Sequence, residues 1–167
     1  KSITGYQAGR SRFATDLDGT AALSNTFADQ LDEEVWSQEF NLISPDQQRV
    51  KWLLGLYYQY DMARFPAKAF PTAEYRIGFP ENVLDIYLWG DTPKETAAVF
   101  GQVSYDISDR LQLQLGARYA HSVSTNDDVY TTYPQFGIVL FQDDEVKDDK
   151  VTGKVTLNWK VDDSNFV

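Results

Sequence analysis

The residue types that could carry chemistry occur at three places in the sequence. The string D-x-D-G-T, from Asp16 to Thr20, sets two carboxylates two residues apart, and an acidic run, DDEVKDD, begins at Asp143. His121 is the only histidine, and there is no cysteine. Thiolate catalysis, disulfides and zinc–thiolate sites are therefore excluded. Transition-metal sites usually combine several imidazole or thiolate ligands, so we expect His121 to be an ordinary polar residue.

Calcium is the first ligand to consider for the carboxylates. An EF-hand loop needs acids at positions 1, 3 and 5, Gly at 6 and Glu at 12. With Gly19 at position 6, positions 1 and 12 are Ala14 and Asn25, and both fail. The run from Asp143 could hold a surface cation loosely, but a solvated charge run is the favoured interpretation. We expect no metal site and no cofactor.

The D-x-D-G-T string also resembles the nucleophile motif of haloacid-dehalogenase-type phosphatases. That resemblance implies a first Asp that attacks phosphorus, a second that acts as acid and base, and a bound magnesium ion. The phosphatase fold needs an apolar parallel strand before the motif and alternating helices and strands. The preceding residues here, GRSRFAT, are mostly polar. We expect a turn after the first strand instead, and no catalytic residue.

The elements that would position any site are strands, because the dominant hydrophobic period is two. Four runs, beginning at Val50, Ala97, Leu111 and Val151, each alternate strictly. One face of the four runs holds 22 positions without a single charge, and its only hydrogen-bonding side chains are Tyr and Trp. These positions are the even-numbered residues of 50–60 and the odd-numbered residues of 97–105, 111–119 and 151–161.

Two weaker strands precede these runs, over residues 2–13 and 35–43. The face of the first is ambiguous. The spacing of Phe27, Leu31 and Val35 leaves open a short helix leading into the second strand. Short turns are expected at 44–48, 108–110 and 162–164. Long polar connections are expected at 16–33, 62–95 and 122–149, and loops of such length are uncommon in compact soluble domains.

Composition narrows the function classes. The net charge of −10 argues against a nucleic-acid partner, because binding phosphate needs a basic face. No apolar run approaches the ~18 residues of a membrane helix. The strands of a transmembrane β-barrel need only ~9–11 alternating residues each, and such barrels have short turns at one end and long loops at the other.

A soluble β-sandwich or lipocalin-like binding module would alternate in the same way, with its apolar face turned inward. The positions of the aromatic residues favour the membrane, where aromatics gather at the two interfaces. If the short turns are periplasmic, one group of aromatics lies near the periplasmic end and another near the outer end. The periplasmic group is Trp52, Tyr105 and Trp159. The outer group is Trp36, Tyr58, Tyr60 and Tyr119.

Four blocks of the sequence together resemble the barrel of TonB-dependent outer-membrane receptors. They are EVWSQEFNLISP, VKWLLGLYYQYD, TAAVFGQVSYDISDRLQLQLGARY and VTGKVTLNWKVDDSNFV. The resemblance implies an antiparallel transmembrane β-barrel in a Gram-negative outer membrane, with its lumen blocked by a plug domain. It also implies active import of a scarce nutrient such as a ferric siderophore, cobalamin or a glycan, energised by the TonB complex.

Residues 1–167 are then expected to be a fragment of that barrel, with six strands and the start of a seventh in up-and-down order. The plug, the N-terminal segment that contacts TonB and the closing strand would lie outside it. The expected partners are outer-membrane lipid, the protein's own plug, TonB through the missing segment, and a small molecule such as a metal chelate. A plugless porin with a water-filled lumen is the alternative in the same membrane.

The candidate ligand-binding residues lie on the polar face and in the loops. Lys51, Tyr57, Gln59, Gln112, Gln114, Arg118 and Lys154 would point into the lumen. Of these, Tyr57, Gln59 and Arg118 lie nearest the outside and are the ones expected to reach a ligand. Arg118 suits an anionic substrate or a plug carboxylate. Tyr130 and Tyr133, with Phe136, are expected to line a vestibule.

Overall fold

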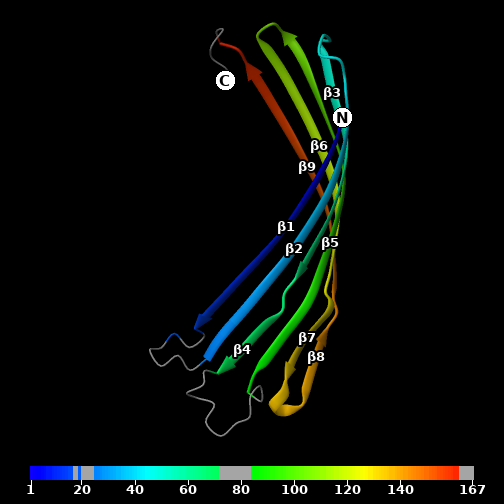
Figure 1. Cartoon of the computed structure of the whole chain (residues 1–167). Coiled ribbons are helices and arrows are strands. Elements are labelled where there is room, and N and C mark those ends of the chain that lie inside the picture. The colour runs from blue at the N-terminus through cyan, green and yellow to red at the C-terminus, as the bar shows by residue number, and fades with distance from the viewer. Residues whose placement is uncertain (17–18, 20–24, 72–83, 162–167) are drawn as a thin grey trace.

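The chain forms one antiparallel sheet of nine strands (Figure 1). The computed structural model describes residues 1–16, 19, 25–71 and 84–161. The strands are β1 (Ser2–Asp16), β2 (Asn25–Ile43), β3 (Val50–Arg64), β4 (Ala67–Pro71), β5 (Ile86–Ser108), β6 (Leu111–Thr125), β7 (Asp127–Tyr133), β8 (Ile138–Gln142) and β9 (Glu145–Trp159), with a 3₁₀ turn, η2 (Pro134–Phe136), between β7 and β8. No described helix is long and apolar enough to cross a bilayer.

Six long strands make up the sheet, in the order β1-β2-β3-β5-β6-β9. The turns β2–β3 and β5–β6 are short and lie at one end of the sheet, which Figure 1 shows at the top. Ser44 closes the first of them: its backbone N–H donates to the Trp52 carbonyl at 2.9 Å, and its Oγ accepts from the Trp52 N–H at 2.9 Å. The expected up-and-down order is therefore confirmed.

The three short strands prolong the sheet at the opposite end. After a link in which the Phe65 N–H donates to the Gly90 carbonyl at 3.0 Å, β4 continues the line of β3 between β2 and β5. β7 and β8 continue the β6–β9 hairpin past an irregularity at Asn126–Asp128, where Asp128 has φ 52°. Gly137, at φ 60°, follows η2 in the left-handed conformation that glycine tolerates best.

The sequence-based limits of the long connections were wrong. β2 begins at Asn25, so the alternative of a short helix over residues 27–35 is wrong: Phe27 pairs with Thr15 on one side and with Ala69 on the other. Residues 62–95 and 122–149 likewise contain strand. Their backbone groups find partners in neighbouring strands even where the side chains are polar. The expected turn at 162–164 and the seventh strand lie outside the described residues.

The strand register gathers 21 of the 22 uncharged positions on one face, here called the apolar face; the other is the polar face. Val161 lies beyond the end of β9. Val50 pairs with Tyr105, Tyr105 with Leu113 and Leu113 with Leu157. The ambiguous first strand is also resolved. Tyr6 pairs with Trp36, so it shares the apolar face with Ser2, Thr4 and Ala8.

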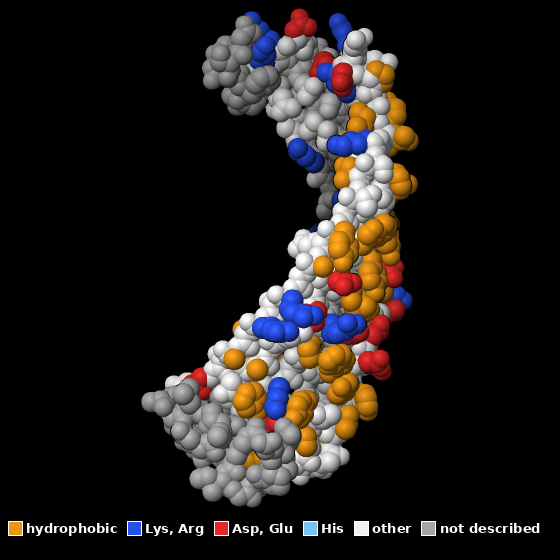
Figure 2. Space-filling view, in the orientation of Figure 1, with side chains coloured by type: hydrophobic (Ala, Val, Ile, Leu, Met, Phe, Trp, Pro, Cys, Tyr) orange, Lys and Arg blue, Asp and Glu red, His pale blue; other side chains and the backbone are white. Residues whose placement is uncertain are grey.

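Nothing in the described part of the chain covers the apolar face. Val151, Val155 and Leu42 remain 77%, 76% and 67% exposed. The accessible surface is 11602 Å², whereas a compact monomer of 19.0 kDa would expose about 8,400 Å². Figure 2 shows hydrophobic side chains along the convex margin of the sheet. This single curved layer is neither a sandwich nor a small closed barrel, whose apolar faces would be turned inward.

Candidate functional site on the polar face

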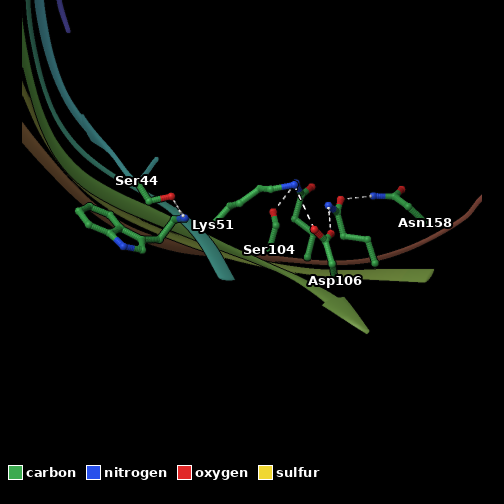
Figure 3. A network of polar contacts seen from close by, with 8 residues as sticks. Ser44, Lys51, Ser104, Asp106 and Asn158 are labelled. Atoms are coloured by element: carbon green, nitrogen blue, oxygen red, sulfur yellow. Dashed lines mark hydrogen bonds and ion pairs between the residues drawn. The ribbon is translucent and has the colours of Figure 1, made fainter. Parts of the chain in front are cut away.

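A hydrogen-bonded network ties four strands together on the polar face, close to the short turns (Figure 3). Lys51 Nζ on β3 lies 3.1 Å from Asp106 Oδ2 on β5. Gln112 Nε2 on β6 donates to Asp106 Oδ1 at 2.7 Å, and Asn158 Nδ2 on β9 donates to Gln112 Oε1 at 3.3 Å. Each of these four side chains comes from a different strand, so the network links β3, β5, β6 and β9 laterally.

Farther along the same face, Arg118 lies over two aromatic rings. Its Cζ atom is 5.2 Å from the centroid of Tyr57 and 5.6 Å from that of Phe100. Cation–π contacts of this kind contribute about 0.5–1 kcal/mol at exposed sites. The Tyr57 hydroxyl donates to Gln59 Oε1. The structure therefore brings together three candidate residues of the polar face, Tyr57, Gln59 and Arg118.

Sequence reasoning missed two residues of this cluster, Gly55 and Phe100. They are paired across β3 and β5, and the Phe100 ring occupies the space above Gly55. A Cβ atom at position 55 would lie only 2.1 Å from Phe100 Cζ. The available signal was one glycine interrupting a strand of large residues, which often marks a close approach by a neighbouring group.

Beside Arg118 the polar face is hollowed by about 380 Å³. The hollow spans β3, β5, β6 and β9, and Arg118 and Lys154 are the only charged residues that line it. Its polar lining includes Gln102 and Thr152, and its apolar lining includes Leu53 and Phe100. A small anionic or polar group is the chemistry that such a lining accommodates.

The two candidate tyrosines of the loop end, Tyr130 and Tyr133, do not share a face. Tyr130 pairs with Trp89 and with Phe141, and the Tyr130 and Phe141 ring centroids are 6.1 Å apart. By alternation along β5, this row continues the apolar face. Tyr133 is three residues farther along β7 and faces the other way. The two tyrosines therefore lie on opposite faces of the sheet, and Phe136 in η2 is exposed.

The apolar face is bounded by aromatic rings and then by charges. Tyr6, Trp36 and Tyr60 form one register row, and the Trp36 and Tyr58 ring centroids lie 5.8 Å apart. At the other end, Trp52, Tyr105 and Trp159 follow an oblique line on β3, β5 and β9. This is the arrangement of two aromatic girdles flanking an apolar band.

Two ion pairs lie beyond the girdle, toward the long connections. Arg10 binds the carboxylate of Asp32 through Nε and Nη2, and Arg64 binds that of Asp91 at 2.8 and 3.0 Å. The Arg10 hydrogen bond holds the pKa of Asp32 below its usual value, and the Asp91 carboxylate raises the pKa of Arg64. Such pairs suit a watery or headgroup environment rather than hydrocarbon.

The other residues that the sequence singled out for chemistry are His121 and the D-x-D-G-T string. His121 Nδ1 lies 2.9 Å from Asp149 Oδ1, which also accepts from the Tyr119 hydroxyl at 2.5 Å. Across the described ranges, no three His, Asp or Glu side chains gather as metal ligands. Asp16 ends β1 and Gly19 has φ 63°, while Asp18 and Thr20 lie outside the described residues. The ladder before this motif is antiparallel, unlike the parallel strand of the phosphatases.

Comparison with known proteins agrees with this geometry. Residues 2–166 match the family described as TonB dependent receptor-like, beta-barrel. Among solved structures, the chain is similar to the ferric yersiniabactin uptake receptor FyuA from Yersinia pestis, with a TM-score of 0.67 and 19% sequence identity. The match covers 84% of this chain and 20% of the FyuA chain, so the chain spans about a fifth of that receptor. Receptors of this family are outer-membrane transporters, not enzymes. The chain belongs to the TonB-dependent receptor-like β-barrel family.

Proposed function

We propose that residues 1–167 form part of the wall, the lumen lining and the extracellular loops of an active importer in a Gram-negative outer membrane. The single observation that supports this most strongly is the two-faced sheet. Its convex apolar face carries aromatic rings at both ends, and its opposite face carries a hydrogen-bonded polar network. A barrel wall needs that division, because lipid lies on one side and a polar lumen on the other.

The orientation follows from the connections. The short turns β2–β3 and β5–β6 face the periplasm, and β4 and the β7–β8 hairpin extend outward. The Arg10–Asp32 and Arg64–Asp91 pairs then lie at the outer surface, above the girdle. Short periplasmic turns and longer outer loops are the usual arrangement in these barrels.

The substrate is a scarce, bulky nutrient, and a ferric siderophore or similar metal chelate is the first choice. FyuA, to which the fold is similar, takes up ferric yersiniabactin; cobalamin and glycans are the other candidates. In the intact protein a plug domain closes the lumen, and the TonB complex supplies the energy. Specificity resides in the outer loops and the plug, rather than in the strands.

The test uses the full-length protein that carries this segment, produced in a Gram-negative host lacking its own iron-chelate receptors. We expect the protein in the outer-membrane fraction and its migration in SDS to change on heating, as for a stable barrel. We also expect uptake of a radiolabelled ferric siderophore that disappears when TonB is deleted. TonB-independent leakage of many small solutes would instead show a porin. Protein that stays in the soluble fraction would refute the membrane assignment altogether.

A further inference from the structure

Like Lys94 on β5, three neighbouring cations of the polar face make no ion pair within the described part of the chain. They are Arg118 on β6 and Lys150 and Lys154 on β9. The chain holds 25 acidic and 15 basic side chains, so carboxylates are plentiful. Lys51, Arg10 and Arg64 all form ion pairs. Arg118 lies on β6, between the described strands β5 and β9, whereas β9 has no described strand on its other side.

The strand register places the three cations together. Arg118 pairs with Thr152, which lies midway between Lys150 and Lys154 on the same face of β9. The carboxylate nearest to them along β9 on this face is Asp148, which is two residues from Lys150 and makes no described ion pair with it. Glu39 lies in the same register row as Lys150, but the three strands β3, β5 and β6 separate the two residues.

The surroundings hold Arg118 in a defined orientation. Tyr57 and Phe100 support its guanidinium, and Gly55 leaves room for the Phe100 ring. An aromatic contact uses the face of the guanidinium and leaves its in-plane N–H donors for an acceptor. Arg118 and Lys154 both line the same hollow of about 380 Å³, whose other lining side chains are neutral.

We propose that this hollow is a carboxylate-binding site on the lumen wall. Arg118 would bind the carboxylate through two parallel hydrogen bonds, and Lys154 would add a point charge. The carboxylate can come from another part of the same polypeptide seated in the lumen, or from a soluble molecule passing through it. The inference rests on the proposed function only in taking the polar face as a lumen wall.

Carbodiimide coupling of the full-length protein in isolated outer membranes separates the two sources. The reagent joins a lysine amine to a carboxylate only where the two are in contact, and peptide mass spectrometry then identifies both residues. Lys51 is the internal control, because it should couple to Asp106. We expect Lys154 to couple to an acidic residue that lies outside the barrel wall if the carboxylate belongs to the same polypeptide.

A soluble source predicts a different result with citrate as the probe. Citrate should then slow acylation of the Lys154 amine and leave Lys51 unaffected. The Arg118→Gln substitution should weaken that protection about tenfold or more, since a hydrogen bond between charged groups is lost. Arg118→Lys should restore it only in part, because lysine cannot make the bidentate contact.

The site assignment is overturned if Lys154 couples only to wall carboxylates such as Asp148, or if it neither couples nor is protected while Lys51 couples normally. Failure of the proposed function gives a different result, since the protein would then be absent from the outer-membrane fraction. A protein that imports its substrate normally and shows no Lys154 contact would refute the carboxylate site and leave the importer in place.

Discussion

Substituting Val155 with arginine tests the assignment of the two faces most directly. Val155 is 76% exposed on the apolar face of β9, four residues from Trp159 and six from Asp149. At about 3.3 Å per residue these separations are about 13 and 20 Å along the strand. With a strand tilt of about 40°, they correspond to heights of about 10 and 15 Å, which together match an apolar band of about 25 Å. Val155 therefore lies well inside the hydrocarbon.

An arginine at the centre of that band costs about 2–4 kcal/mol of stability, with smaller costs toward the interfaces. Thr156→Arg is the matched control, because Thr156 is the next residue of the same strand and faces the polar side beside Gln114. We expect Val155→Arg to lower the free energy of unfolding by about 2–4 kcal/mol and Thr156→Arg to change it by less than about 1 kcal/mol.

The assay is urea unfolding of the full-length receptor in lipid vesicles, followed by tryptophan fluorescence. Wild type, Val155→Arg and Thr156→Arg are unfolded reversibly under the same conditions. The free energy of unfolding of each variant is then subtracted from that of wild type. Equal costs for the two substitutions, or a larger cost for Thr156→Arg, would refute the assignment of Val155 to lipid and of the polar face to the lumen.

Two further predictions concern the polar face and the outer ion pairs. Gly55→Ala should destabilise the receptor by about 1–3 kcal/mol, because the Phe100 ring must move. Gly9→Ala is the control and should cost far less, because no atom lies within 4 Å of the added Cβ. Equal effects of the two substitutions in urea unfolding would contradict the packing of Phe100 over Gly55. The depressed pKa of Asp32 means that its pairing with Arg10 stabilises the fold above the usual carboxyl pKa of 3.8 and that this contribution is lost as the pH falls below that value. Asp32→Asn should therefore reduce the dependence of stability on pH in that acidic range, and an unchanged profile would show that the pair contributes nothing there.

The sequence predicted the long strands correctly where apolar residues alternate with the residues of the other face. Between Val50 and Tyr60, every second residue is apolar, and the membrane requires that alternation along the whole span. The rule stops at the girdle. In the proposed orientation, water lies on both faces above the girdle, so residues 25–34 of β2 and 86–94 of β5 can be polar and still pair. Periodicity therefore did not reveal where these strands begin.

The candidate site was predictable to the same extent. Alternation placed Tyr57, Gln59 and Arg118 on one face, and the register then brought Arg118 over Tyr57. Phe100 was missed because its role depends on Gly55 in another strand, which a single sequence does not show to be a neighbour. Tyr130 and Tyr133 were grouped by closeness in sequence, but an odd spacing of three residues separates them in a strand.

The strand order has a consequence for how such a wall can change during evolution. Among the six long strands, each pairs only with the ones before and after it along the path β1-β2-β3-β5-β6-β9. Duplicating or deleting a complete hairpin, such as β6 with β9, leaves the direction of every later strand unchanged. Adding a single strand would reverse them all and place the long outer loops in the periplasm. Widening or narrowing of these barrels should therefore proceed two strands at a time, in agreement with their even strand numbers in bacteria.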